Sequence, residues 1–159
     1  MKILVLFYSR SGTTKTAAET IAREIGADIE ELRDTVDRSG PLGYLLAGRD
    51  AAREKMTDIE PMHRRCADYD LIVLGTPVWA SAMAPAVRTA IVRNKAEIKN
   101  VALFCTMGGL GGPKVLLDME KLTDRKPIAT LSLRTHHVKS GRCGENIKAF
   151  VEAIRASAV

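Results

Sequence analysis

Three short runs of apolar residues constrain the fold of this 159-residue chain more than any other feature of its sequence. The runs are residues 3–7, 71–74 and 101–104, and none of them alternates between apolar and polar side chains. Continuous apolar strands of this kind are typical of parallel sheets that are covered by helices on both faces. We therefore predict that these runs form the central strands of a parallel sheet.

Weaker strand signals and helical periodicity complete the pattern. Residues 28–32 and 128–133 alternate, which predicts strands with one exposed face at the edges of the sheet. Apolar residues recur at helical spacing between the strands, and Pro or Gly marks several helix ends. The predicted helices include residues 18–25, segments that begin at Pro85 and Pro113, and residues 147–154.

This order of elements predicts an α/β fold with a five-stranded, doubly wound parallel sheet between two layers of helices. The strand order 2-1-3-4-5 fits, because it places the two alternating strands at the edges. Residues 1–159 are predicted to form a single domain. Residues 33–65 are too long for a usual connection, so we expect part of them to be a surface insertion, with a helix that Gly48 breaks.

Composition excludes several classes of protein. The chain is 46% hydrophobic with a formal net charge of +5, which is typical of a globular domain rather than a disordered chain. No apolar run approaches the ~20 residues of a membrane-spanning helix, and residues 3–7 are interpreted as a strand rather than a signal peptide. The three cysteines are far apart, which favours a reducing cytoplasm over a disulfide framework or a zinc site.

The loop after the first strand has the composition of a phosphate site. Ligands of open parallel sheets bind beyond the carboxyl ends of the strands, where the strand order reverses. Residues 9–14, Ser-Arg-Ser-Gly-Thr-Thr, lie at such an end and lead into a helix. Hydroxyl groups and the free N–H groups of a helix N-terminus bind phosphate. A simple N-cap needs one hydroxyl, whereas this loop holds four, so we predict an anion site.

Two further loops should lie beside the first one. Residues 75–85 contain Trp79, the single tryptophan of the chain, whose flat ring can pack on a planar ligand or fold onto the core. Residues 106–113 hold four glycines, which either let the backbone approach a ligand closely or form an ordinary flexible loop.

The sequence does not match the motifs of several other ligand-binding and catalytic sites. A dinucleotide-binding GxGxxG motif starting at Gly109 would need glycine where Lys114 stands, and no Walker sequence is present. A Cys-x5-Arg phosphatase loop starting at Cys105 would need arginine at position 111, which is glycine, and the acidic residues of a receiver domain are missing. We predict no catalytic side chain, because no nucleophile–base pair or acid cluster emerges. We also predict no metal site, because the adjacent His136 and His137 are expected to point apart as surface or partner residues.

Together, the three loops resemble those of the flavodoxin-like family, whose phosphate motif Ser/Thr-x-Ser/Thr-Gly-x-Thr is matched in full by residues 9–14. The likeness covers almost the whole chain apart from residues 33–65, and it implies an FMN site. The implied contacts of the phosphate are Ser9, Arg10, Ser11, Gly12, Thr13 and Thr14. The implied contacts of the isoalloxazine ring are Thr76, Pro77, Val78, Trp79 and Ala80 beside it, and Thr106, Met107, Gly108 and Gly109 near its pyrimidine edge.

Two features separate the chain from flavodoxins that act as carriers. Such carriers are usually acidic, and they often have an aromatic residue in the loop after the fourth strand, where this chain has Met107-Gly108-Gly109-Leu110. Basic residues are concentrated in residues 110–142, which could dock a phosphate of NAD(P)H or an acidic partner.

Two functions therefore stay open. The first is electron transfer through bound FMN to or from a redox partner protein. The alternative is an NAD(P)H-dependent, FMN-containing flavin or quinone oxidoreductase that acts on a small planar acceptor. A scaffold that has lost its flavin is a third hypothesis, disfavoured by the intact phosphate motif. Neither nucleic acid nor a membrane is an expected partner, and the sequence leaves the oligomeric state open.

Overall fold

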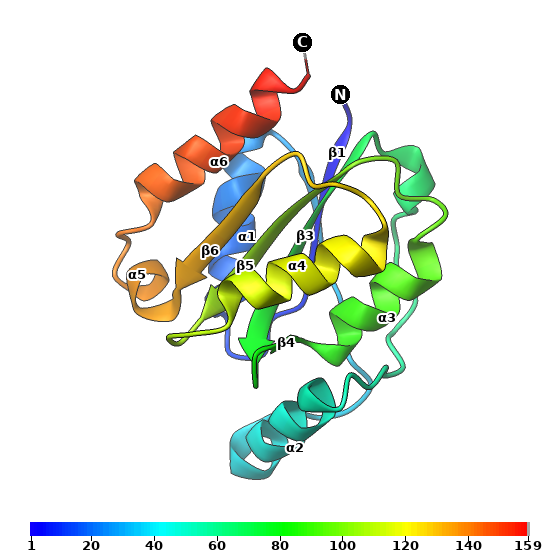
Figure 1. The fold of residues 1–159 in the computed structure, drawn as a ribbon, viewed down its shortest axis with the longest axis vertical. Helices are drawn as coiled ribbons and strands as arrows, with labels where there is room; N and C mark the ends of the chain where they lie inside the picture. The colour runs from blue at the N-terminus through cyan, green and yellow to red at the C-terminus, as the bar shows by residue number, and fades with distance from the viewer. Residues whose placement is uncertain (159) are drawn as a thin grey trace.

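A computed structural model describes residues 1–158 as a parallel sheet between two layers of helices (Figure 1). The parallel strands follow the order β2-β1-β3-β5-β6, and the short β4 pairs antiparallel with the end of β3. With β4 set aside, this is the predicted 2-1-3-4-5 order. The bounds of the strands are Ile3–Phe7 for β1, Asp28–Glu31 for β2, Leu71–Trp79 for β3, Ala82–Met83 for β4, Val101–Met107 for β5 and Thr130–Arg134 for β6.

The helices divide between the two faces of the sheet. In Figure 1, α1 and α6 cover one face, and α3 and α4 cover the other. Each face has its own apolar core: Ile21 and Phe150 belong to the first, and Ile91 and Met119 to the second. The bounds of the helices are Thr13–Ile25 for α1, Gly40–Ala52 for α2, Pro85–Asn94 for α3, Gly112–Thr123 for α4, Thr135–Lys139 for α5 and Gly144–Ala156 for α6, with a 3-10 turn at Cys66–Asp68.

The third predicted strand is longer than its apolar run. We expected residues 75–85 to form a loop, but β3 continues to Trp79, and Pro77 still pairs with Thr106 of β5. The extension depends on Gly75, because a Cβ atom at that position would lie 2.1 Å from the ring of Phe104. A glycine at the end of an apolar run therefore allows the strand to continue beside a large side chain.

The expectation that Gly48 breaks a helix is wrong. α2 runs without interruption through Gly48, with Ala47 and Ala51 buried against the rest of the protein. Tertiary packing outweighs the cost of about 1 kcal/mol that one glycine imposes on a helix interior. An isolated bridge between Asp34 and Ile59 brings the two ends of the segment together. That part of residues 33–65 is an insertion stays a prediction.

The expectation that His136 and His137 point apart is also wrong. Both lie in the short α5, and their ring centroids are 4.0 Å apart. Successive residues of a helix are separated by about 100°, which lets long neighbouring side chains meet, whereas a strand would put them on opposite faces. Within residues 1–158, no group of three metal-binding side chains is found.

Candidate functional site

The loop at residues 9–14 forms an open helix N-terminus at the carboxyl end of β1. Gly12 precedes α1 with φ of 97°, a left-handed conformation that glycine adopts without strain. The Gly12 N–H donates to Ser9 Oγ at 3.1 Å, and no side chain in the described residues 1–158 caps the helix. The N–H groups of the first turn are thus free to bind an anion, and the helix dipole favours a negative charge there.

The hydroxyl groups of this loop have different surroundings. Ser11 is exposed to solvent, whereas Thr13 and Thr14 are buried. The Thr14 hydroxyl lies 2.7 Å from the hydroxyl of Thr106, which is also buried at the end of β5. This hydrogen bond joins two of the predicted loops. Thr14 and Thr106 therefore fix the position of the first loop relative to the end of β5.

Arg10 joins the same loop to the segment that carries α2. Its Nε donates to the carbonyl of Arg38 at 2.9 Å, and Nη2 donates to the carbonyl of Gly40 at 3.3 Å. Its guanidinium lies over the ring of Tyr44, 5.3 Å from the centroid. The side chain therefore reaches from the predicted phosphate loop to the first turn of α2.

A tight hairpin presents Trp79. Trp79 pairs with Ala82, and the two residues between them, Ala80 and Ser81, have φ of 49° and 58°. Positive φ at both central residues is the geometry of a type I′ turn, which is costly for residues other than Gly, Asn or Asp. The buried Thr76 hydroxyl supports the hairpin, since it accepts from the Ala84 N–H at 3.0 Å.

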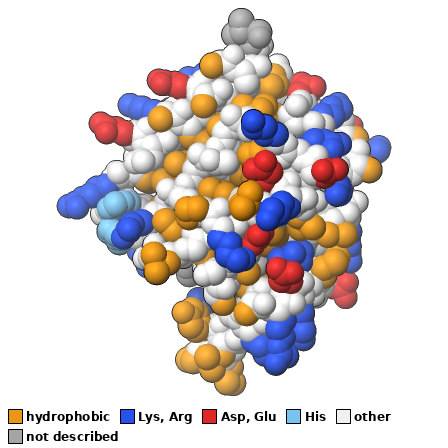
Figure 2. Space-filling model, viewed as in Figure 1, with side chains coloured by type: hydrophobic (Ala, Val, Ile, Leu, Met, Phe, Trp, Pro, Cys, Tyr) orange, Lys and Arg blue, Asp and Glu red, His pale blue; other side chains and the backbone are white. Residues whose placement is uncertain are grey.

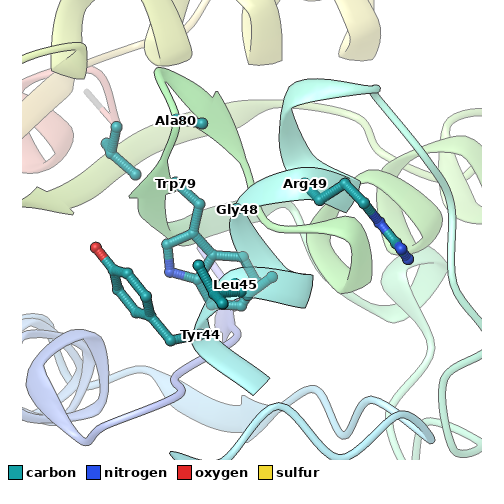
Figure 3. Close-up of a pocket in the computed structure, with 8 residues that line it drawn as sticks. Tyr44, Leu45, Gly48, Arg49, Trp79 and Ala80 are labelled. Carbon is teal, nitrogen blue, oxygen red and sulfur yellow. The ribbon is translucent and has the colours of Figure 1, made fainter. Parts of the chain in front are cut away.

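Trp79 lines a pocket of about 400 Å³ between the hairpin and α2 (Figure 3). An edge-to-face contact with Tyr8, at 5.4 Å between ring centroids, holds the indole. Burial of Tyr8 raises its pKa to about 12, so its phenol is neutral at physiological pH. The pocket is lined by Tyr44, Leu45, Ala47, Gly48, Arg49, Val78, Trp79 and Ala80.

A buried ion-pair network fixes the position of α2. Arg38 is 4% exposed, and its guanidinium donates to Asp34 at 2.7 Å and to Asp50 at 3.0 Å. Burial alone would raise the pKa of Asp50, but the hydrogen bonds from Arg38 and Arg49 outweigh it and lower that pKa. The same guanidinium lies 6.0 Å from the centre of the Trp79 ring. One buried cation thus connects α2 to the pocket.

The glycine-rich loop closes the other side of the hairpin. Gly111 has φ of 96°, and a Cβ atom there would lie 3.0 Å from Ser81. Lys114, in the first turn of α4, donates to the carbonyl of Ser81 at 3.3 Å. A Cβ atom at Gly108 or Gly109 would meet no atom within 4 Å. Met107 ends β5, so the predicted ring contacts Met107, Gly108 and Gly109 lie at the carboxyl edge of the sheet.

Basic residues lie near this edge as well. β6 ends at Arg134, which pairs with Met107, and Lys139 and Arg142 follow in and after α5. All three are exposed. Figure 2 shows pale-blue histidine among blue Lys and Arg side chains at the edge of the molecule where α5 lies. Of the basic residues predicted in segment 110–142, Arg134, Lys139 and Arg142 therefore lie on the side of the glycine-rich loop, whereas Lys121 lies at the far end of α4.

Sequence reasoning missed the contribution of α2. Tyr44 and the buried Arg38 were not among the predicted site residues, although both adjoin Trp79 or its pocket. The apolar run Leu42-Gly43-Tyr44-Leu45 inside the predicted insertion could have marked Tyr44 as unusual. Nothing in the sequence distinguishes Arg38 from the many solvated arginines of the chain.

Comparisons with known proteins agree with this geometry. Residues 1–132 match the model of a family described as NADPH-dependent FMN reductase. A search of curated proteins returns no significant match. No helix within residues 1–158 is long and apolar enough to cross a membrane.

Solved structures provide a second comparison. The chain is 26% identical to a flavoprotein from Lactobacillus acidophilus NCFM in complex with FMN, with a TM-score of 0.72 over 87% of this chain and 97% of that chain. It is 18% identical to the two-electron reduced flavodoxin from Megasphaera elsdenii, with a TM-score of 0.59 over 94% of this chain and 98% of that one. This second likeness establishes a shared flavodoxin-like fold, as predicted.

Proposed function

The chain belongs to the NADPH-dependent FMN reductase family, and from this premise we propose that it uses bound FMN to pass electrons from NAD(P)H to a small planar acceptor. FMN as the cofactor is supported by the family and by the FMN complex of the Lactobacillus acidophilus flavoprotein. When bound, FMN supplies the redox chemistry by accepting a hydride and giving up electrons one or two at a time. The protein has to bind the cofactor, orient it and control access to it.

The residues at the carboxyl edge of the sheet fit the phosphate of FMN. The N-terminus of α1 has no side-chain cap within residues 1–158, and it is preceded by Gly12 in a left-handed conformation. Ser11 is exposed beside this turn and can donate a hydroxyl hydrogen bond. This uncapped, hydroxyl-rich helix N-terminus next to an aromatic pocket is the observation that carries the proposal.

The pocket around Trp79 fits a planar ring. Its volume of about 400 Å³ lies within the range of small-molecule sites, and aromatic and aliphatic side chains form much of its lining. Gly108 and Gly109 leave space at the neighbouring loop, where backbone N–H groups could reach a polar ring edge. We assign the phosphate to residues 9–14 and the ring to residues 76–80 and 106–109.

The basic surface supports NAD(P)H as the electron donor. Arg134, Lys139 and Arg142 are exposed beside the loop that we assign to the ring. A cluster of cations attracts the phosphates of a nicotinamide nucleotide and raises its local concentration. This surface favours a reductase over a protein that exchanges electrons only with a basic partner.

A flavin titration and a rapid-mixing experiment test the proposal. The purified protein should bind FMN stoichiometrically and quench its fluorescence, and NADPH or NADH should bleach the flavin absorption under anaerobic conditions. Ser11→Ala should weaken FMN binding about tenfold through the loss of one hydrogen bond to a charged phosphate. Thr20→Val, which removes a hydroxyl in the interior of α1, away from its N-terminus, is the matched control and should leave the affinity unchanged. Absence of FMN binding would refute the proposal.

An electron carrier is the second candidate, and exposed apolar side chains favour it. Leu42, in the first turn of α2, and Leu110, in the glycine-rich loop after β5, are 83% and 89% exposed. Exposed apolar groups beside a redox centre suit the docking of a protein partner. If FMN binds but neither nucleotide bleaches it, the carrier function is favoured. We also propose a reducing, cytoplasmic setting, in keeping with the three free, buried cysteines.

A further inference from the structure

Tyr44 is an aromatic side chain that α2 leaves open to solvent. It is 64% exposed, and so is much of Leu42 and Leu45 on the same helix. Figure 2 shows hydrophobic side chains gathered at the end of the molecule where α2 lies. The chain is poor in aromatic residues, with 4% Phe, Trp and Tyr, so a largely exposed tyrosine beside a pocket is a feature that core packing does not explain.

The ring of Tyr44 is oriented from the phosphate loop. The guanidinium of Arg10 lies 5.3 Å from the ring centroid, within the range of a cation–π contact. Arg10 is itself held by the carbonyl of Arg38, at 2.9 Å. Tyr44 therefore lies between the loop that we assign to the phosphate and the pocket that we assign to the ring.

The backbone that carries Tyr44 is fixed as well. A Cβ atom at the preceding residue, Gly43, would lie 2.2 Å from the carbonyl carbon of Arg38. This close approach packs the first turn of α2 onto the backbone of Arg38, whose side chain is buried between Asp34 and Asp50. Tyr44 thus projects from a helical turn whose position is fixed by the buried ion pairs of Arg38.

Tyr44 and Trp79 are the aromatic residues in the lining of the same pocket. In Figure 3, the phenol of Tyr44 and the indole of Trp79 face this shared space, whereas Arg49 points away from it. The residues that follow β5, from Gly108 to Gly112, have no aromatic side chain. A planar ligand in the pocket could therefore contact two aromatic rings, the indole of Trp79 on the hairpin and the phenol of Tyr44 on α2.

We propose that Tyr44 is a cofactor-binding residue whose phenol ring packs against the isoalloxazine ring of FMN, so that α2 and the hairpin hold the flavin between Tyr44 and Trp79. The inference rests on the proposed function, because it requires that FMN binds. Aromatic rings gain additional stabilisation from stacked or edge-to-face contact, beyond the area they bury. Residues 33–65 would then form a wall of the cofactor site.

Binding of FMN to the apoprotein tests this role without measuring turnover. Tyr44→Ala should raise the FMN dissociation constant about tenfold, which corresponds to about 1.4 kcal/mol, and should increase the residual fluorescence of bound flavin. Tyr44→Phe keeps the ring and should retain the affinity and most of the quenching. Leu42→Ala removes a more exposed apolar side chain of the same helix, and it should change neither quantity.

Each other outcome contradicts the inference in a recognisable way. If Tyr44→Ala binds and quenches FMN like the unaltered protein, Tyr44 does not contact the ring. If it raises only the KM of a quinone acceptor and leaves FMN binding unchanged, Tyr44 contacts the acceptor instead. Equal losses in Tyr44→Ala and Leu42→Ala would assign the effect to α2 as a whole. Failure of the unaltered protein to bind FMN would refute the proposed function itself.

Discussion

The loop at residues 9–14 and helix α2 flank the candidate site, and they obtain their positions by different means. The turn of the loop depends on local geometry, because Gly12 reverses the chain and its N–H donates to Ser9 three residues away. α2 depends on contacts between residues further apart, above all the Arg38 guanidinium with Asp50 and the Arg38 carbonyl with the side chain of Arg10. A locally specified loop should tolerate change elsewhere, whereas a helix held by one buried cation should be sensitive to single substitutions and to acid.

The largest effect is expected from Arg38→Met. Removal of the guanidinium leaves Asp34 and Asp50 without their buried partner, which should lower the free energy of unfolding by about 3–5 kcal/mol. Denaturant unfolding followed by Trp79 fluorescence measures this, because Trp79 is the single tryptophan. The matched control is Arg33→Met, whose exposed pair with Glu60 at 4.0 Å should contribute little. Equal losses in both variants would contradict the role of the buried network.

A smaller effect should appear in acid. Because the native pKa of Asp50 lies below its ordinary value of 3.8, the unfolded chain binds a proton more readily than the native protein there. The stabilisation from Asp50 is present above pH ~4 and is lost as the pH falls through the native pKa. Asp50→Asn should cost about 1.5–3 kcal/mol at pH 7 and less at pH 3.

The control for this acid limb is Asp118→Asn, which removes a surface pair with Lys114. It should cost less than about 1 kcal/mol at pH 7, because solvent screens exposed pairs. A difference between Asp50→Asn and the unaltered protein that does not shrink in acid would show that the charge of Asp50 does not stabilise α2.

The hydrogen bond between Thr14 and Thr106 should contribute less to the free energy of unfolding than either ion pair of Arg38. Thr106→Val leaves the buried Thr14 hydroxyl without its partner at 2.7 Å, at an expected cost of about 1–2 kcal/mol. The double variant Thr14→Val with Thr106→Val removes both polar groups and should recover most of that loss. Thermal unfolding of Thr14→Val, Thr106→Val and the double variant measures the coupling. Strictly additive losses would mean that the two hydroxyls do not interact.

The smallest effect should be a gain in stability. Gly48→Ala should stabilise the protein by about 1 kcal/mol, because alanine favours a helix interior and its Cβ would meet no atom within 4 Å. Gly43→Ala, in the same helix, should instead destabilise it, because its Cβ would collide with the backbone of Arg38. Chemical denaturation of both variants measures their free energies of unfolding. A loss at Gly43 and a gain at Gly48 would show that the position of α2 requires glycine only at residue 43.

The sheet and the turn before α1 were predictable because their signals are local. Continuous apolar runs predicted β1, β3 and β5, and the hydroxyls with Gly12 predicted the turn before α1. The continuation of β3 to Trp79 was missed, because it depends on how Gly75 packs against Phe104 of a neighbouring strand. The contact between His136 and His137 was missed because α5 is too short to show a helical periodicity of apolar residues.

The sequence by itself determined the order of the parallel strands and the turn that precedes α1, because periodicity and glycine positions act over a few residues. Tertiary structure alone decided where α2 lies and that Tyr44 shares a pocket with Trp79. That arrangement arises from a buried guanidinium between two carboxylates distant from each other in the chain. Such a network leaves no pattern in the sequence, because the residues adjacent in the chain do not distinguish a buried arginine from an exposed one.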